Sequence, residues 1–336
     1  MGFSNNQMVE EGDSRLLSKI LLSLIFLVLF IILLYSSYLL YIHIPREPVN
    51  LNIDVAEIIS SNITEKGITG TEAKQFYPNM KFNHNNISYF FHNSCDDRKK
   101  ERLKKAFNEI TRNVNLLSFV EVDKNPDIFV SCEKNSEENI QQEYFIAGEG
   151  GAREIIPTGR FNIINEGVIF LYDNPNKHLV KCDYPNVEIH ELMHVFGFDH
   201  NNDKKSIMYP LLDSCDQQLD DSIVEELKKI YLIEDIPDLY FEDINAVKKG
   251  IYLDFKLTIK NSGSVPAENI KVVVLDEGEV IEVFNLDRVD YGGGILIETN
   301  NLKLKRLKPD NLEFVIDKEN KIKEIDEKNN AAIINL

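Results

Sequence analysis

Cysteines are few in this chain, and basic residues are fewer than acidic ones. Four of the 336 residues are cysteines and none forms a C-x-x-C pair, which argues against a thiolate zinc site or a thioredoxin-like motif. Lysine and arginine number 37 against 55 acidic residues, so the net charge of −18 argues against nucleic acid as a partner. No repeat of fixed period is visible. The length predicts two globular domains plus additional segments.

Charged side chains are missing from residues 20–42. With a rise of about 1.5 Å per residue, a helix of this length can cross a hydrocarbon core of about 30 Å. We therefore expect a single-pass transmembrane anchor at 20–42, preceded by a cytoplasmic N-terminus at 1–19. Arg15 and Lys19 precede the run and Arg46 follows it, which favours the N-terminus inside and the rest of the chain outside the cell membrane.

Two other interpretations of this run stay open. A cleaved signal peptide is the first, although the run is long for one and no A-x-A-like site follows it. A buried core helix is the second. An extracytoplasmic location favours disulfides among Cys95, Cys132, Cys182 and Cys215, and the alternative is four buried free thiols.

The next segment, residues 43–85, is weakly patterned and contains both proline and glycine, so we interpret it as a stalk or linker. A strand is expected at 87–91, followed by a helix capped by Asp96 or Asp97. Residues 147–151 (AGEGG) are expected to be a flexible turn. Further elements are expected as follows: strands at 127–131, 161–164 and 168–172, and helices at 185–196, with Asp183 as its cap, and at 222–231.

Histidines gather in one stretch, HELMHVFGFDH, which spans residues 190–200. His190 and His194 are four residues apart on the expected helix, so both imidazoles project from one face. Gly197 can take a positive φ, which lets the helix stop and the chain return with His200 as a third ligand. Three histidines around one zinc ion leave the fourth tetrahedral position for water, as catalytic sites do. The alternative is a polar helix face that holds no metal.

Glu191 lies beside these histidines on the same helix. A zinc ion would lower the pKa of its bound water and polarise a peptide carbonyl. Glu191 would then act as the general base and return the proton to the leaving amine. The motif thus predicts a zinc-dependent hydrolase of peptide bonds with one catalytic ion and no covalent intermediate.

A second motif, Ser-Ile-Met-Tyr-Pro at 206–210, follows the histidines. Together the two motifs resemble the metzincin zinc metalloproteases, and within them the matrixin branch. The resemblance implies an α+β catalytic domain at 86–235, built on a mixed sheet with an active-site helix. It also implies that Met208 forms an apolar floor beneath the histidines and that Tyr209 and Pro210 continue the methionine turn.

The flanking sequence agrees with this resemblance over about residues 86–232. Residues 167–173 resemble the matrixin strand that leads toward the active-site helix, and we expect the strand at 161–164 to be the edge that pairs with an extended substrate. The chain also departs from the family. It has no cysteine switch in 43–85, only His178 in the region of the second zinc, Leu212 in place of a pocket tyrosine, and Asn201 after the third histidine.

The resemblance also suggests one of the three connectivities that four cysteines allow. Cys95 would pair with Cys132, and Cys182 with Cys215. The second bond would brace the loop that enters the active-site helix against the segment that follows the methionine turn.

The pattern changes near residue 240, where apolar residues begin to alternate as in half-buried strands. Short strands, regular turns and no helix predict an all-β sandwich over 240–336. It resembles the CARDB module, through Leu257-x-Ile259-x-Asn261-x-Gly263 and the closing acidic and amide-rich string at 317–330. That string could bind calcium through its oxygens, or it could form turns and a solvated edge. Since the module has no histidine or cysteine, we expect it to bind a surface, polymer or substrate rather than to catalyse.

The sequence therefore predicts a membrane-anchored zinc endopeptidase that acts on proteins or peptides outside the cytoplasm. Two other functions remain open: a catalytically inactive adhesion or binding protein at the cell surface, and a structural domain stabilised by a metal. The presence of Glu191 together with all three histidines favours the enzyme.

Overall fold

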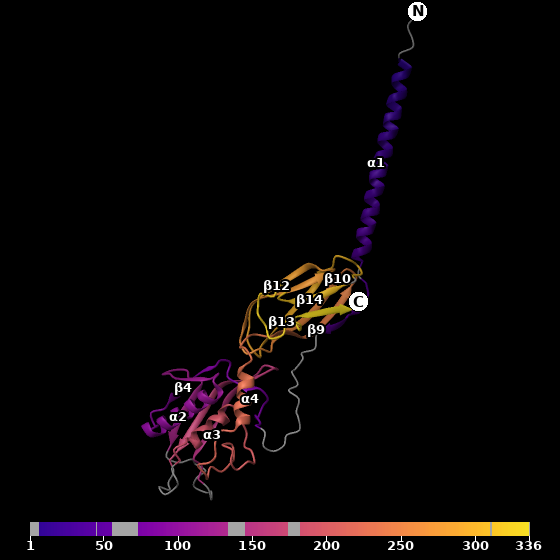
Figure 1. Ribbon diagram of the computed structural model, residues 1–336. Helices are drawn as coiled ribbons and strands as arrows, with labels where there is room; N and C mark the ends of the chain where they lie inside the picture. Colours follow the sequence, from indigo (N-terminus) through magenta and orange to yellow (C-terminus); the bar gives the residue numbers. More distant parts are fainter. Residues whose placement is uncertain are drawn as a thin grey trace, which may run out of the picture.

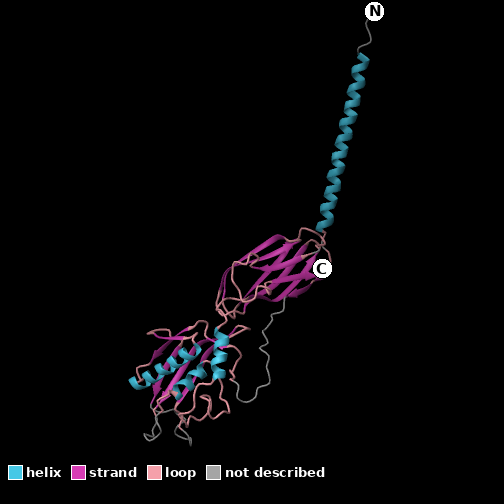
Figure 2. Ribbon diagram, viewed as in Figure 1, coloured by secondary structure: helices cyan, strands magenta, loops and turns pink. Residues whose placement is uncertain are grey.

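The computed structural model describes residues 7–44, 46–55, 73–133, 145–173, 182–309 and 311–335. The chain forms three parts: a long N-terminal helix, an α+β domain and a β-sandwich (Figure 1). The helix leaves one end of the sandwich, and the α+β domain adjoins the opposite end. Figure 2 shows that helices are confined to the first two parts.

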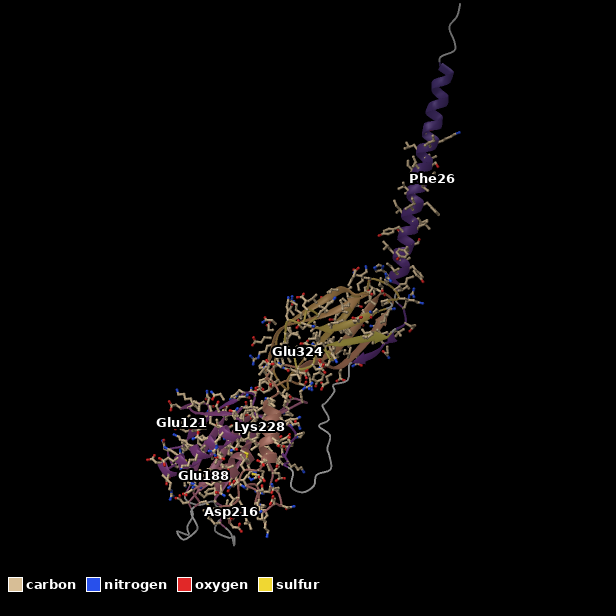
Figure 3. The ribbon with its side chains drawn as sticks, viewed as in Figure 1. Phe26, Glu121, Glu188, Asp216, Lys228 and Glu324 are labelled. Atoms are coloured by element: carbon tan, nitrogen blue, oxygen red, sulfur yellow. A yellow bond between two sulfur atoms is a disulfide. The ribbon has the colours of Figure 1, made fainter. Side chains whose placement is uncertain are left out.

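The N-terminal helix α1 spans Gln7–His43. Its section Ser18–His43 is long and apolar enough to cross a membrane, and none of the most apolar part is buried by the rest of the protein. Phe26, for example, projects from the isolated helix (Figure 3) and is 64% exposed. Such a surface is stable only in an apolar surrounding. The helix ends on the sandwich, where the His43 and Tyr252 rings lie 6.2 Å apart.

The α+β domain is built on one sheet in the order β3-β8-β6-β4-β5, with β7 added beside β8. All pairs are parallel except β7 with β8, so the sheet is mixed, as expected. The strands are β3 (Met80–Lys81), β4 (Asn86–Phe91), β5 (Ser118–Glu121), β6 (Ile128–Glu133), β7 (Gly148–Pro157) and β8 (Asn162–Tyr172).

Three helices pack against this sheet and each other, namely α2 (Asp97–Val114), α3 (Asn186–Val195) and α4 (Asp221–Tyr231). Asp96 caps α2, since its carboxylate accepts the N–H of Lys99. The expected cap of α3 by Asp183 is wrong, because the cap position is Pro185 and no side chain caps it. Instead Arg102 of α2 binds the buried Glu188 in the first turn of α3 and also donates to carbonyls just before it.

Two expectations about the sheet are wrong. Residues 161–164 and 168–172 were expected as two strands, but β8 runs unbroken through the intervening Gly167. Gly167 is needed for packing, because a Cβ there would lie 2.5 Å from a methyl group of Val195 in α3. Residues 147–151 were expected as a flexible turn, but residues 148–151 begin β7, which pairs antiparallel with β8.

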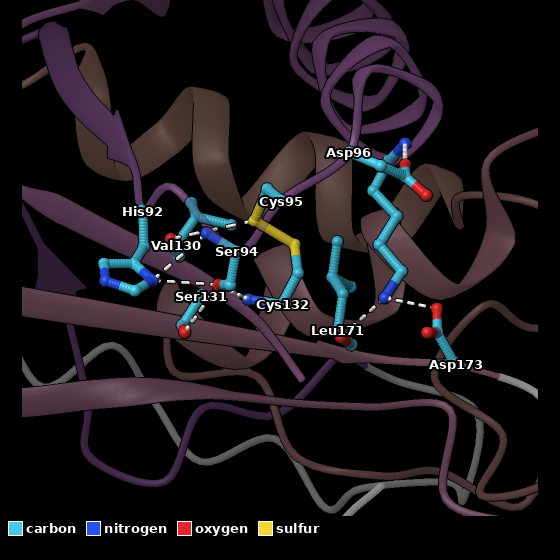
Figure 4. The surroundings of a disulfide bond; sticks show 10 residues. His92, Ser94, Cys95, Asp96, Val130, Ser131, Cys132, Leu171 and Asp173 are labelled. Atoms are coloured by element: carbon cyan, nitrogen blue, oxygen red, sulfur yellow. Dashed lines mark hydrogen bonds and ion pairs between the residues drawn. A yellow bond between two sulfur atoms is a disulfide. The ribbon is translucent and has the colours of Figure 1, made fainter. Parts of the chain in front are cut away.

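Both expected disulfides are present. Cys95 and Cys132 join the start of α2 to β6, with their sulfur atoms 2.04 Å apart (Figure 4). Cys182 and Cys215 join the segment before α3 to the segment after the methionine turn. The second bond therefore ties together the two segments on either side of the region that carries the histidines, whereas the first braces α2 against the sheet.

The C-terminal domain is a sandwich of two antiparallel sheets, in the orders β1-β9-β10-β13 and β12-β11-β14-β15-β2. Its apolar core joins both sheets, as in the contact at 4.9 Å between the rings of Phe255 and Phe314. The strands of this domain that follow the α+β domain are β9 (Leu239–Lys249), β10 (Tyr252–Asn261), β11 (Ala267–Asp276), β12 (Glu279–Val289), β13 (Gly294–Lys303), β14 (Leu312–Ile316) and β15 (Ala331–Asn335).

Part of the expected stalk belongs to this sandwich. Strand β1 (Val49–Asn50) pairs with β9 in one sheet, and β2 (Asn52–Val55) pairs with β15 in the other. The sandwich is thus completed by residues on both sides of the α+β domain in the sequence. Residues 73–85 of the expected linker belong to the α+β domain instead, since they include β3 and the buried Phe82. Residues 56–72 lie outside the described residues.

The closing string of the sandwich forms turns rather than a cluster of free carboxylates. Asp317 accepts the N–H of Ile322, and Asp326 accepts the N–H of Lys328. Glu324 is buried and accepts the N–H of Leu239 and the amide of Asn330. These carboxylates therefore hold the backbone, which is one of the two roles expected for the string.

Buried polar contacts join the α+β domain to the sandwich. Arg160, in the β7–β8 turn, binds Asp238, whose side chain is fully buried. Thr158 in the same turn donates its hydroxyl to the carbonyl of Ser262 at 2.8 Å. The buried Lys81 binds Asp235 at 2.7 Å in the connection between the domains. Since buried charges are costly unless paired, these contacts hold the two domains in a defined arrangement.

Candidate metal centre

The three histidines converge on one point. His190 and His194 project from the same face of α3, and His200 returns toward them from the loop that follows. Their Nε2 atoms form a triangle with sides of 3.1, 3.1 and 3.2 Å. This group is the one cluster of histidine, cysteine and acidic side chains with metal-site geometry in the part of the chain that the structure describes.

Gly197 produces the turn that brings His200 back. Its φ of +84° lies in the left-handed region, and helix α3 ends just before it. Any side chain would also collide with Met80, whose sulfur would lie 2.2 Å from a Cβ at this position. Backbone conformation and packing therefore both demand glycine here.

The second nitrogen of two histidine rings is fixed by the backbone. Nδ1 of His190 donates to the carbonyl of Ile207 at 2.6 Å, and Nδ1 of His194 donates to that of Phe198 at 2.8 Å. This tautomer leaves the Nε2 lone pairs directed at the common point. Burial lowers the pKa of His190 to about 4 and also lowers that of His194, so both rings are neutral ligands at physiological pH.

Zinc suits this donor set. Three imidazole nitrogens at about 2.0–2.1 Å from one tetrahedral ion are separated from each other by about 3.3 Å, close to the triangle in the structure. The donors come from one helix and one adjoining loop, and two of them are oriented by backbone carbonyl groups. Three protein ligands, rather than four, leave room for a water or substrate oxygen.

Glu191 is buried beside these histidines under strand β7. Burial is the main cause that raises the pKa of its carboxyl to about 8, and the charge of Glu149 adds to it, whereas the N–H of Gly150 lowers it. A carboxyl group with a pKa near neutrality can both accept and return a proton. Its placement and its acidity therefore match the role of general acid and base.

The glycines of β7 create the space for this carboxylate. A Cβ on Gly148 would lie 2.7 Å from Cγ of Glu191, and one on Gly150 would lie 2.1 Å from its carbonyl oxygen. Strand β7 therefore crosses α3 in backbone contact. The segment read as a flexible turn is a fixed wall of the site, and its free edge replaces 161–164 as the strand that could pair with a substrate.

A buried hydrogen-bond network shapes the methionine turn, and sequence reasoning did not find it. The hydroxyl of Ser206 donates to Asp220 at 2.6 Å and accepts from Asn201 and from the N–H of Met208. Asn201, noted only as a departure from the family, is thus a structural partner of this turn. The network fixes Ile207, whose carbonyl holds His190.

The other expected residues of this turn differ in exposure. Met208 is 1% exposed and belongs to the core of the domain, as an apolar floor would require. Tyr209 is half-buried, and Pro210 is exposed. Leu212 is partly buried and packs against the core. The structure therefore places Met208 in the interior and Pro210 at the surface.

Phe76 is a further residue at the site that the sequence did not single out. Its ring stacks on His194 with 6.3 Å between centroids, and it remains 54% exposed. The N–H of Phe76 donates to the carbonyl of Gly197 at 2.8 Å. The segment that precedes the α+β domain therefore continues as part of the rim of the metal site.

Fold and site together define a class. The domain has a mixed sheet, two histidines and a glutamate on one helix, a third histidine after a glycine turn, and a buried methionine in the turn that follows. This combination is typical of a zinc metalloprotease fold of the metzincin type. Comparison with protein families identifies the branch: residues 81–232 match the matrixin family, and residues 236–333 match the CARDB family. The chain therefore carries a matrixin domain followed by a CARDB domain, as the sequence predicted.

Solved structures resemble the C-terminal domain. A CARDB domain from Pyrococcus furiosus, crystallised in complex with di-metal ions, is 18% identical with a TM-score of 0.25, over 30% of this chain and 86% of that one. A domain of a Methanosarcina acetivorans protein, solved by NMR, is 20% identical with a TM-score of 0.24, over 30% and 90%. A comparison with curated proteins found no match.

Proposed function

We propose that the protein is a membrane-anchored zinc endopeptidase that cleaves proteins or peptides outside the cytoplasm. The observation that carries this proposal is the Nε2 triangle of His190, His194 and His200 with the buried carboxyl of Glu191 next to it. Three imidazole ligands, an open ligand position and an adjacent base are the parts that metal-assisted hydrolysis needs.

Each residue has a distinct task in this reaction. Zinc held by the three histidines would polarise the scissile carbonyl and acidify a water molecule. Glu191 accepts the proton of the attacking water and delivers it to the leaving amine. The carbonyls of Ile207 and Phe198 keep His190 and His194 in the tautomer that presents Nε2. The N–H of Gly150 stabilises the ionised form of Glu191.

Strand β7 provides the binding surface for the substrate in this proposal. Among the described residues it pairs with β8 alone, so its other edge can accept a further strand as far as Pro157, where the sandwich packs against it. A polypeptide in extended conformation can add to this edge through main-chain hydrogen bonds. Because β7 crosses Glu191 at Gly148 and Gly150, a peptide on this edge would pass the general base.

Helix α1 and the disulfides support the location. The helix passes directly into the sandwich, where Ile42 packs against the core, as expected for an anchor that is retained. All four cysteines are oxidised in pairs, which suits an oxidising compartment. With the N-terminus inside, both folded domains would lie outside the cytoplasm.

The test uses the full chain in lipid nanodiscs with a fluorescently labelled, denatured casein. Zinc-loaded protein should cleave it, and a chelator should stop cleavage until zinc is restored. Glu191→Gln should lower the rate by at least about 100-fold while the zinc content stays at one ion per chain. Glu225→Gln, an exposed glutamate on α4, is the control and should leave the rate unchanged.

The result also separates the enzyme from the alternatives. Stoichiometric zinc with no cleavage of any denatured protein by the unaltered chain would contradict the peptidase and favour a binding protein. Cleavage that survives Glu191→Gln would show that another group is the base.

A further inference from the structure

The free edge of β7 leads into the sandwich. In the β7–β8 turn, the N–H of Thr158 donates to the carbonyl of Phe161, so the adjoining pair Pro157 and Asn162 is not hydrogen-bonded across the strands. The polar groups of such a pair point outward. The N–H of Asn162 accordingly points away from β7 and donates to the backbone carbonyl of Asn79. The carbonyl of Pro157 therefore faces the free edge of β7.

A loop of the sandwich packs against that carbonyl. A Cβ on Gly292, in the turn between β12 and β13, would lie 2.8 Å from the carbonyl oxygen of Pro157 and 3.1 Å from a methyl group of Ile156. The sandwich thus occupies the end of the edge on which a substrate strand would lie. Arg160 with Asp238 and Thr158 with Ser262 hold this contact in place.

Apolar side chains are exposed next to this contact. Tyr291 is half-buried in the turn itself, and Leu296, near the start of β13, is 52% exposed. Within the described ranges, β13 pairs with β10 alone and is an edge strand of its sheet, so its other edge carries backbone groups outside the sheet. A chain that leaves the edge of β7 at Pro157 would meet Tyr291 and then Leu296.

We infer that the sandwich binds the distal part of an extended polypeptide substrate, with Tyr291 and Leu296 receiving an apolar residue far from the scissile bond. This rests on the peptidase function proposed above. The occupant is the same polypeptide that lies on β7, because the turn between β12 and β13 contacts the end of that edge at Ile156 and Pro157. The CARDB domain is then an accessory substrate-binding site rather than only a spacer.

The geometry sets the length of substrate that can reach this site. Gly150, level with Glu191, and Pro157 are separated by seven residues along β7. At about 3.3 Å per residue this is about 23 Å. A substrate must therefore extend about seven residues from the scissile bond, on one side only, before it contacts the sandwich.

A series of peptides tests this inference on the full chain in nanodiscs. Starting from one cleaved sequence, residues are added stepwise on either side of the scissile bond, with an apolar residue at the end. KM should fall about five- to tenfold when one side reaches about seven residues, while kcat stays within about twofold. No such step should occur on the other side.

Variants of the sandwich test whether the fall in KM depends on Tyr291 and Leu296. The double substitution Tyr291→Ala and Leu296→Ser should abolish the fall in KM and leave the kinetics of short peptides unchanged. The control is Ile333→Ser, because Ile333 is similarly exposed, at 49%, but lies on β15. Binding of the same peptides to the Glu191→Gln variant, followed by fluorescence anisotropy, should show the same step without turnover.

The outcomes separate the two proposals. Three outcomes would overturn the accessory site and leave the peptidase intact. In the first, short peptides are cleaved but KM does not fall with length; in the second, the fall in KM survives the double substitution; in the third, KM rises for long peptides. A step in binding without cleavage of any peptide would instead support the site and contradict the peptidase.

Discussion

Gly150 and Glu191 are in van der Waals contact through their backbones, since a Cβ on Gly150 would lie 2.1 Å from the carbonyl oxygen of Glu191. The same glycine donates its N–H to the carboxylate of Glu191. One residue therefore sets the distance between β7 and the active-site helix and also opposes the rise that burial causes in the pKa of Glu191.

Gly150→Ala should reduce peptide cleavage by at least about tenfold, because the methyl group must separate β7 from α3 and misplace Glu191. Zinc binding should be retained, since the histidines lie on the helix and on the loop after it. The matched control is Gly151→Ala, because a Cβ there meets nothing within 4 Å. Steady-state kinetics with a zinc assay check both variants. Equal activity in the two would refute the steric account.

Ser206→Ala should destabilise the α+β domain by about 1–3 kcal/mol, because the hydroxyl is buried with three hydrogen-bond partners. Zinc affinity should fall about tenfold, since the loop that holds His190 loses its support. Thermal unfolding and a competitive zinc titration measure these effects. Ser222→Ala, a half-exposed position on α4, serves as the control. Unchanged zinc affinity in Ser206→Ala would show that the network serves stability alone.

The two disulfides should differ in their effect on activity although they close loops of similar length, with separations of 37 and 33 residues. Replacing either pair with serine should cost about 3–4 kcal/mol of unfolding free energy. Loss of Cys182–Cys215, which brackets α3, should also weaken zinc binding, whereas loss of Cys95–Cys132 should not. Denaturant unfolding and zinc titration of the two double variants compare them. A similar loss of zinc affinity in both would contradict this distinction.

The sandwich should become less stable as the pH rises through neutrality. Burial raises the pKa of Glu324 to about 7, above its ordinary value of 4.5 in an unfolded chain. The protonated group therefore favours the folded state: its contribution is fully present below pH 4.5 and is lost as pH rises through about 7. The loss is on the order of 2–3 kcal/mol. Glu324 lies in the half of the sandwich nearer the α+β domain (Figure 3).

Urea unfolding between pH 4.5 and 8 measures this effect, with Glu324→Gln as the comparison. The variant should show a shallower decline of stability with pH, because it cannot ionise. Glu319→Gln, an exposed position in the same closing string, should keep the slope of the unaltered protein. An identical slope in Glu324→Gln would assign the pH dependence to other groups.

The convergence of the three histidines could be predicted from sequence because its geometry is local. The four-residue spacing of His190 and His194 is set by the helix, and Gly197 must turn the chain for His200 to return. The sandwich was likewise evident, since alternation along a strand reports directly which face is buried. These signals need no knowledge of distant contacts.

The features that the sequence did not reveal depend on contacts between residues that are far apart along the chain. Residues 148–151 have the composition of a turn, but Gly148 and Gly150 are needed for contact with α3, about 40 residues later. Strands β1 and β2 have two and four residues, too few for a periodic pattern, and they are ordered by β9 and β15. The hydroxyl of Ser206 finds Asp220 only once the methionine turn has folded.

The position of β1 and β2 has a mechanical consequence. Because these strands precede the α+β domain and complete a sandwich that follows it, the anchor is joined to the rest of the protein twice, once through the chain and once through backbone hydrogen bonds in both sheets. A single cut between Val55 and the α+β domain would not shed the catalytic portion, because β2 would remain paired with β15. If the protein is the membrane-anchored enzyme proposed above, release into the medium would require unfolding of the sandwich or a second cut between the two domains. A single cut that frees a simply tethered enzyme would then leave this one at the membrane.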